Sequence, residues 1–163
     1  MHEEYMKMAL AEAEQALRAG DFPVGCVITD ETGLLSRGRR INSSSGNELD
    51  HAEIVALRKL YAEYPQRDWG DLAIYSTMEP CLMCFSTLIL NNVHTIVYAY
   101  EDAMGGGTSL PLAGLKPLYS SKKMVIVADV LRRESLALFK RFFQEDTYGY
   151  WRNSLLAEYT LRQ

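Results

Sequence analysis

Hydrophobic positions follow two spacings along this chain, and the spacings alternate from one segment to the next. Between Tyr5 and Leu17 apolar side chains recur three or four residues apart, which predicts a helix with one buried face that stops at Gly20. Short apolar runs bounded by turn residues predict strands. The predicted strands are 24–28, 34–37, 72–77, 93–99 and 124–127, and further helices are predicted from His51 towards Pro65, around Cys81 and Cys84, from Leu131 to Phe142, and from about Tyr150 to Tyr159.

This alternation of strands and helices predicts an α/β fold, in which helices cover both faces of one sheet and ligands bind beyond the strand ends. The polar stretch 30–33 predicts a tight hairpin between the first two strands. The runs 93–99 and 124–127 are apolar, so we expect both to be buried between helices on either face of the sheet.

Length and composition predict one compact domain that spans residues 1–163. With 48% hydrophobic residues the chain can fill one core, and it is too short for two ordinary domains. No apolar stretch approaches the ~20 residues that cross a bilayer, and the charged N-terminal segment lacks the apolar centre of a signal peptide. We therefore expect a cytoplasmic protein without a membrane partner, and the three cysteines fit a reducing compartment.

Two short motifs predict a zinc site. His51 and Glu53 are two residues apart, and Cys81 and Cys84 follow three apart after a proline, which is an H-x-E…P-C-x-x-C pattern. One histidine and two thiolates give zinc three ligands and leave the fourth position to a water, as in catalytic rather than structural sites. Zinc lowers the pKa of such a water from about 15.7 toward about 7. Glu53, beside the metal but not bound to it, is the predicted proton carrier.

The spacing of these residues also predicts where they lie. Cys81 and Cys84 fall on one face of a helical turn, and Pro80 is the residue type preferred at a first helical position. His51 and Glu53 do not face each other along a helix, so both reach one metal only if His51 opens its helix. Two helix N-termini would then point at the site and favour ionised cysteines.

A redox-active cysteine pair or a structural zinc knuckle is the alternative interpretation of the C-x-x-C motif. A closed knuckle needs a fourth ligand, and the remaining candidates Cys26, His2 and His94 stand at no ligand-like spacing from the others. Cys26 lies in an apolar run and is expected to be a small buried residue. The two motifs together therefore favour the catalytic zinc site.

The motifs and their surroundings resemble the cytidine deaminase-like zinc hydrolases, in the branch of bacterial tRNA adenosine deaminases and guanine deaminases. The similarity covers most of the chain and is carried by segments 23–25, 51–58, 75–81 and 102–110. The resemblance implies a three-layer αβα fold with a central five-stranded mixed sheet, a homodimer, and one Zn²⁺ per subunit. It also implies that His51, Cys81 and Cys84 are the ligands. The implied reaction is hydrolysis of an exocyclic amino group to a carbonyl with release of ammonia, with Glu53 as the catalytic acid and base.

The substrate-binding residues depart from the family pattern. The family places an Asn shortly before the H-x-E helix, and counting from Gly38 puts Arg40 at that place, with Asn42 two residues later. Asn reads a base edge as donor and acceptor, whereas Arg supplies only donors and would select carbonyl or phosphate oxygens. Either residue is a candidate, and an ordinary turn residue is the alternative for Asn42. Phe22 and Val24 are further candidates for pocket walls, with plain packing as their simpler interpretation.

The C-terminal segment is aromatic and lacks the Arg-rich ending that we associate with the tRNA enzymes. Tyr150, Trp151 and Tyr159 could stack on a flat ring as a lid or dock the terminus, and docking is our preferred interpretation. The glycine-rich stretch 104–109 lacks the Lys-Ser/Thr pair of a P-loop, so we expect a mobile loop near the site.

These features predict a zinc-dependent deaminase of a small aminated heterocycle, which is a free base, a nucleoside or a similar molecule. Guanine or another purine is the first candidate. The alternative is a tRNA-specific adenosine deaminase acting at the wobble position. A tRNA substrate calls for a basic surface, and the net charge of −4 disfavours it, although Lys and Arg could gather on one face of a folded dimer. A third class is a non-catalytic zinc-bearing interaction domain, in which Glu53 would lack an obvious role.

Overall fold

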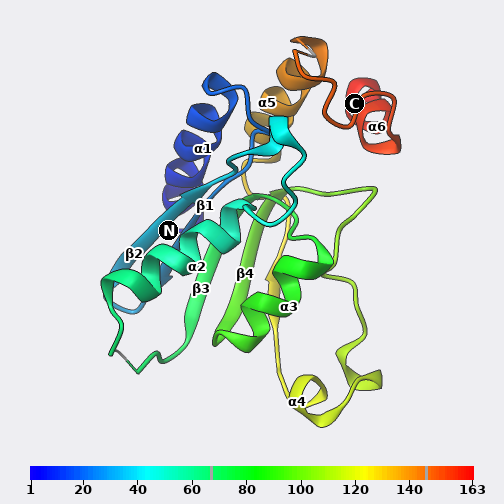
Figure 1. The fold of residues 1–163 in the computed structure, drawn as a ribbon. Helices are drawn as coiled ribbons and strands as arrows, with labels where there is room; N and C mark the ends of the chain where they lie inside the picture. The colour runs from blue at the N-terminus through cyan, green and yellow to red at the C-terminus, as the bar shows by residue number, and fades with distance from the viewer. Residues whose placement is uncertain (67, 146) are drawn as a thin grey trace.

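A five-stranded mixed sheet forms the centre of the structure (Figure 1). The computed structural model describes residues 1–66, 68–145 and 147–163. The strands are β1 (Gly25–Asp30), β2 (Gly33–Arg39), β3 (Leu72–Met78), β4 (Val93–Tyr100) and β5 (Val125–Val127). They lie in the order β2-β1-β3-β4-β5, in which β1 is antiparallel to both neighbours and β3, β4 and β5 are parallel. The predicted hairpin is confirmed, because Asp30 pairs with Gly33 at its turn.

Helices cover both faces of this sheet, which confirms the predicted layers (Figure 1). The helices are α1 (His2–Arg18), α2 (Ala52–Glu63), α3 (Leu82–Leu90), α4 (Pro117–Ser120), α5 (Arg132–Glu145) and α6 (Leu155–Arg162). The α2 and α3 helices lie on one face, α1 and α5 lie on the other, and α6 packs against α5. Among the described residues, no helix combines the length and the apolar character that spanning a membrane requires.

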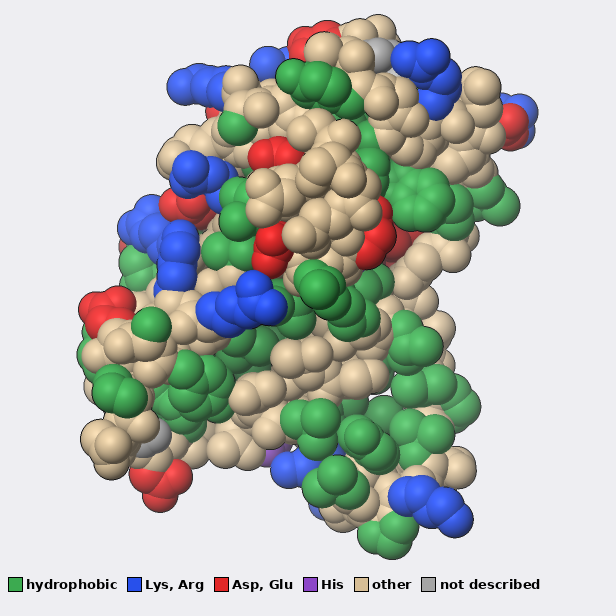
Figure 2. All heavy atoms as spheres, viewed as in Figure 1, with side chains coloured by type: hydrophobic (Ala, Val, Ile, Leu, Met, Phe, Trp, Pro, Cys, Tyr) green, Lys and Arg blue, Asp and Glu red, His purple; other side chains and the backbone are tan. Residues whose placement is uncertain are grey.

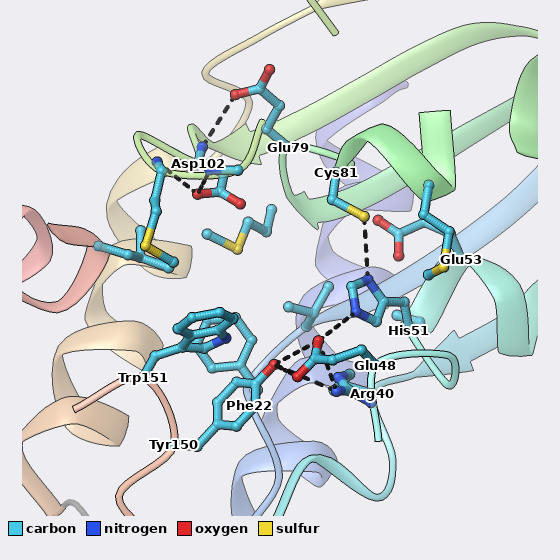
Figure 3. Close-up of a pocket in the computed structure, with 17 residues that line it drawn as sticks. Phe22, Arg40, Glu48, His51, Glu53, Glu79, Cys81, Asp102, Tyr150 and Trp151 are labelled. Atoms are coloured by element: carbon cyan, nitrogen blue, oxygen red, sulfur yellow. Dashed lines mark hydrogen bonds and ion pairs between the residues drawn. The ribbon is translucent and has the colours of Figure 1, made fainter. Parts of the chain in front are cut away.

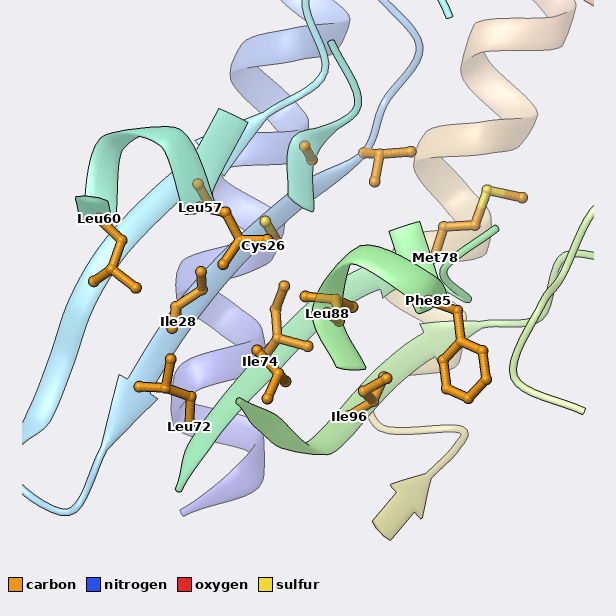
Figure 4. Close-up of a cluster of buried hydrophobic side chains, with 14 of the residues drawn as sticks. Cys26, Ile28, Leu57, Leu60, Leu72, Ile74, Met78, Phe85, Leu88 and Ile96 are labelled. Carbon is orange, nitrogen blue, oxygen red and sulfur yellow. The ribbon is translucent and has the colours of Figure 1, made fainter. Parts of the chain in front are cut away.

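Alternation along the strands sends successive side chains to opposite layers. Ile28, Ile74 and Ile96 are register partners on neighbouring strands, and all three are fully buried beneath α2 and α3 (Figure 4). Their neighbours Val27 on β1, Tyr75 on β3 and Val97 on β4 point to the opposite face and pack in a separate cluster with the apolar side of α1. The sheet is therefore held by two apolar layers.

Replacing Ile96 with alanine should destabilise the protein. Ile96 is 0% exposed, so the substitution leaves a cavity that its neighbours only partly fill. We expect the free energy of unfolding to fall by about 2–5 kcal/mol. Val125→Ala, at a side chain that is 56% exposed, is the matched control and should change that free energy by no more than about 0.5 kcal/mol. Denaturant unfolding followed by circular dichroism measures both, and equal losses would contradict this assignment of the core.

The last strand, β5, differs from the sequence-based expectation. The run 124–127 does form a strand, but Val125 is 56% exposed and Ile126 is 36% exposed, so the expected burial on both faces is wrong. The reason is position, because β5 is the edge strand of the sheet and is only three residues long. The β4 strand, which lies between two neighbours, is mostly buried as expected.

The last helix begins later than the predicted start at about Tyr150. It starts directly after Ser154, whose hydroxyl accepts a hydrogen bond from the Ala157 amide and caps the first turn. Before this cap, Trp151 and Asn153 have positive φ angles of 56° and 58°, which a right-handed helix does not contain. Tyr150 and Trp151 therefore lie on turns that precede the helix.

Candidate metal centre and active site

The three predicted zinc ligands lie at the starts of two helices. His51 is the residue before α2 and has an extended backbone with ψ 153°, which confirms that it opens its helix. Cys81 is the residue before α3, with ψ 171°, and Cys84 lies in the first turn of that helix. The expectation that Pro80 is the first helical residue is wrong, since Cys81 itself precedes the helix. Both helix N-termini therefore point at the ligands, as expected.

The distances between the ligand atoms fit a zinc ion. The Nδ1 atom of His51 lies 3.5 Å from the Sγ atom of Cys81 and 3.5 Å from that of Cys84. Zinc bonds of about 2.0–2.1 Å to nitrogen and about 2.3 Å to sulfur, at a tetrahedral angle, would place such atoms about 3.6 Å apart. Among the described residues, the group of potential ligands within 4.8 Å of one another has these three members. The donor set is therefore that of an open, catalytic site.

The two cysteines differ in how readily they lose a proton. A hydrogen bond from Cys84 lowers the pKa of Cys81 to about 4, with burial opposing and His51 assisting the shift. The same hydrogen bond, together with burial and the nearby carboxylate of Glu53, raises the pKa of Cys84 well above its usual value. Cys81 is therefore a ready thiolate ligand, whereas metal binding must displace the proton of Cys84.

Glu53 lies beside the ligand group and is almost fully buried, with 3% of its surface exposed. One carboxylate oxygen accepts a hydrogen bond of 3.2 Å from the Ser76 hydroxyl on β3, and the other lies 3.4 Å from the Cys84 sulfur. Burial, with the nearby Cys81, raises the pKa of Glu53 above the usual range of a carboxyl group. The sheet and the α3 helix thus hold one carboxyl group against the predicted metal without adding it to the ligand group.

A cavity of about 610 Å³ opens next to these residues (Figure 3). Its size is typical of small-molecule sites. Phe22, Val24 and Arg40 line it, together with His51, Glu53 and Cys81 from the metal centre, and their contact with a substrate stays a prediction. Asn42 does not line the cavity. Its side chain instead donates to the carboxylate of Asp50 over 2.9 Å, at a backbone φ of 59° that is typical of a turn residue.

Arg40 is 1% exposed, and most of its N–H groups donate hydrogen bonds inside the protein. Its guanidinium donates to the backbone carbonyl of Ile41 over 2.7 Å, to that of Asp50 over 3.2 Å, and to that of Asn47. Within the described part of the chain, its Nε atom has no hydrogen-bond partner. Arg40 therefore fixes the loop of residues 41–50 that leads into His51, which is a role that a shorter Asn could not fill.

The amino-acid sequence of this chain matches a known protein family. Residues 1–100 match the cytidine and deoxycytidylate deaminase zinc-binding region. The chain belongs to this deaminase family. Membership and ligand geometry together identify a zinc-dependent nucleobase deaminase, a hydrolase with a zinc-binding site at His51, Cys81 and Cys84. The redox and knuckle interpretations of the C-x-x-C motif are thereby set aside.

Curated relatives of this deaminase are tRNA-specific adenosine deaminases. The one from Streptococcus pyogenes serotype M18 is 32% identical over 107 residues, which cover 65% of this chain and 67% of that protein. The matched segment covers 63% of three further Streptococcus pyogenes relatives. The one from Bacillus subtilis is 26% identical over 141 residues, or 86% of this chain and 88% of that protein.

A solved guanine deaminase from Nitrosomonas europaea has the same fold. It superposes with a TM-score of 0.70 at 19% identity, over 86% of this chain and 83% of that one. The deaminase therefore has the cytidine deaminase-like fold, with a five-stranded mixed sheet and helices packed on it, which the resemblance implied.

Sequence analysis missed Glu48, which lies in the cavity wall next to His51 (Figure 3). One of its carboxylate oxygens lies 3.2 Å from the Nε2 atom of His51, and the other accepts a hydrogen bond of 2.9 Å from the Tyr150 hydroxyl. Tyr150 and Trp151 also line the cavity, while the Tyr150 ring packs 5.3 Å from that of Phe22. The C-terminal aromatics of the deaminase thus both dock the terminus and form part of the cavity wall.

The glycine-rich loop lies next to the zinc centre of the deaminase, as predicted. Gly106 pairs with Cys81 in an isolated β-bridge, and the Gly107 amide donates to the Pro80 carbonyl over 2.9 Å. A side chain at Gly107 would come within 2.7 Å of the Leu82 backbone, so only glycine permits this close approach. The expected mobility of the loop stays a prediction.

Proposed function

We propose that this deaminase acts on a purine held within tRNA, the adenosine at the wobble position. The observation that carries the proposal is the extent of similarity to a tRNA-specific adenosine deaminase, since the match with the Bacillus subtilis relative runs over 86% of this chain. It extends well beyond the zinc motifs. A cavity of about 610 Å³ beside the metal centre supports the proposal, because it leaves room for a base that remains attached to its ribose.

In this proposal Glu53 carries the protons of the reaction. When bound, zinc supplies the Lewis acidity that makes hydroxide available near neutral pH. Glu53 accepts a proton from the attacking water and delivers it to the ring nitrogen. It then takes the proton of the newly added hydroxyl and delivers it to the amino group, so that the carbon–nitrogen bond breaks, the carbonyl forms and ammonia leaves. Its buried position between Ser76 and Cys84 keeps the carboxyl group in one orientation throughout.

We propose roles for the remaining candidates from their places in the cavity wall. Phe22 and Val24 are the proposed apolar contacts of the purine ring. Arg40 acts through the loop that it holds, since its two terminal nitrogens already donate to backbone carbonyls. Asn42 contacts Asp50 outside the cavity, so we do not include it among the ring contacts.

A free purine base is the second candidate, and the charge of the cavity favours it. Glu48, Glu79 and Asp102 line the cavity along with Glu53, and such carboxylates repel phosphate groups. On the face drawn in Figure 2, Lys and Arg side chains lie in separate places and form no continuous basic patch. Trp151 in the cavity wall adds a flat surface on which a small ring could stack.

Ammonia release distinguishes the two candidates. The substrates are a tRNA anticodon stem-loop with adenosine at the wobble position, the same stem-loop with guanosine there, and free guanine, adenine and adenosine. We expect turnover of the adenosine stem-loop alone, with a rate that falls at least about 10-fold between 50 and 200 mM salt because phosphate contacts are lost. The Glu53→Ala protein is the blank.

Turnover of a free purine at a salt-independent rate, without turnover of the stem-loop, would reject the tRNA proposal in favour of the second candidate. Zinc binding without turnover of any of these substrates would favour the third class, a zinc-bearing interaction domain. Three other expectations stay predictions: a homodimer with one zinc per subunit, a single domain over residues 1–163, and a cytoplasmic location.

A further inference from the structure

The two nitrogens of the His51 ring have different partners (Figure 3). Nδ1 faces the sulfurs of Cys81 and Cys84, each 3.5 Å away, and is the atom that can bind zinc. Nε2 points the other way and lies 3.2 Å from a carboxylate oxygen of Glu48. A neutral imidazole carries one proton, so only the tautomer protonated on Nε2 satisfies both sides.

We propose that Glu48 is a positioning residue for the zinc centre. Its carboxylate holds the proton of His51 on Nε2, fixes the orientation of the ring and leaves Nδ1 free for the metal. A carboxylate on the second nitrogen of a metal-binding histidine also makes the ring a better ligand. The inference rests on the zinc site and is independent of which purine derivative is the substrate.

Glu48 is itself held in place, although its side chain is 51% exposed. The Tyr150 hydroxyl lies 2.9 Å from one carboxylate oxygen and 3.2 Å from the other. The guanidinium of Arg40 lies 3.7 Å away and binds the backbone of the same loop on either side of Glu48. An unrestrained surface glutamate would sample several rotamers, whereas these contacts favour the one that meets His51.

The same contacts connect the C-terminal segment to the metal. Tyr150 lies on the turn before α6, 102 residues along the chain from Glu48, and its hydroxyl contacts the carboxylate that meets His51. Since Tyr150 and Trp151 also line the cavity, the segment that shapes the substrate site contributes to zinc binding. Glu48 is the residue that contacts both the cavity-lining C-terminal segment and the zinc ligand His51.

Zinc affinity, measured by competition with a chromophoric chelator, tests the proposal without reference to turnover. We expect Glu48→Ala to weaken zinc binding about 10–100-fold. Glu48→Gln keeps an oxygen that accepts from Nε2, so its affinity should lie between those of Glu48→Ala and the wild type. Glu31→Ala, an exposed position in the β1–β2 turn, is the matched control and should bind zinc as the wild type does. Affinity of Glu48→Ala within twofold of this control would overturn the proposal.

The contribution of Tyr150 is tested by a double-mutant cycle. Tyr150→Phe keeps the ring and removes the hydroxyl, so it should weaken zinc binding less than Glu48→Ala does. In the Glu48→Ala background the same change should weaken zinc binding much less than it does in the wild type, because the hydroxyl has then lost the carboxylate and keeps only its 3.5 Å contact with Arg40. Fully additive losses would overturn the connection between the C-terminal segment and the metal.

The tautomer of His51 can be measured on the wild-type protein, so this test does not depend on whether a variant folds. In ¹⁵N-resolved NMR spectra of the zinc-loaded wild-type protein, we expect His51 to carry its proton on Nε2 and its metal on Nδ1. A zinc-loaded His51 with the proton on Nδ1 would overturn the proposal, whatever the variants show. None of these three measurements depends on the substrate, so failure here is distinguishable from failure of the proposed function.

Discussion

Glu53→Ala should lose nearly all ammonia release while keeping its zinc. The carboxyl group lies beside the ligands but outside the group of three, so its removal takes away the proton carrier and leaves every ligand in place. Loss of a general acid and base typically lowers turnover by about 10²–10⁴-fold. Metal analysis of the purified variant, together with steady-state kinetics on the substrate found by the screen, measures both quantities.

A matched control for this variant comes from the same helix. Glu63→Ala changes an exposed glutamate at the C-terminal end of α2, far along the helix from Glu53, and should leave both zinc content and turnover unchanged. Normal turnover by the Glu53→Ala protein would refute its assignment as proton carrier. Loss of zinc from Glu53→Ala would instead make it a ligand, which is equally contrary to the prediction.

Cys84→Ala should abolish both zinc retention and activity. Cys84 is 0% exposed and is one of three protein ligands, so its loss should weaken zinc binding by more than the ~100-fold that an outer hydrogen-bond partner contributes. Wild-type protein stripped with a chelator should lose turnover to the same level and regain it when zinc is restored. Metal content and ammonia release measure the two effects.

Cys26→Ala is the matched control for the ligand variant. Cys26 is also 0% exposed, but it lies on β1 and is absent from the group of ligand atoms. Its substitution tests the effect of a lost buried thiol on packing alone, and zinc content should stay normal. If Cys26→Ala and Cys84→Ala lost zinc equally, the three-ligand assignment would be contradicted.

The metal centre could be predicted from the sequence because its chemistry is local. His51 and Cys81 each precede a helix, and spacings of two and three residues are enough to bring Glu53 and Cys84 to the same point. Glu48 carries no such signal, because its contact with His51 depends on a loop shape that Arg40 imposes from the preceding strand end. Hydrogen bonds between a buried side chain and backbone carbonyls leave no periodic pattern in the amino-acid sequence from which the loop shape could be predicted.

The fold was predictable where side-chain periodicity reports burial, and less so at its margins. The helices and strands of the core follow the pattern, as Ile28, Ile74 and Ile96 illustrate. The start of α6 was misplaced, because Trp151 and Asn153 adopt positive φ angles that residues other than glycine rarely adopt. The exposure of β5 was missed, because an apolar run does not tell whether its strand lies at the centre or the edge.

That edge position has a consequence for self-association. An uncovered edge strand offers free backbone groups with which another chain can pair, and apolar side chains such as Val125 and Ile126 add to the hazard of aggregation. Two features of this segment oppose such growth: the strand has only three residues, and Lys122 and Lys123 stand just before it. Short length and lysine charge are among the means by which natural sheets block strand addition, and this edge has both.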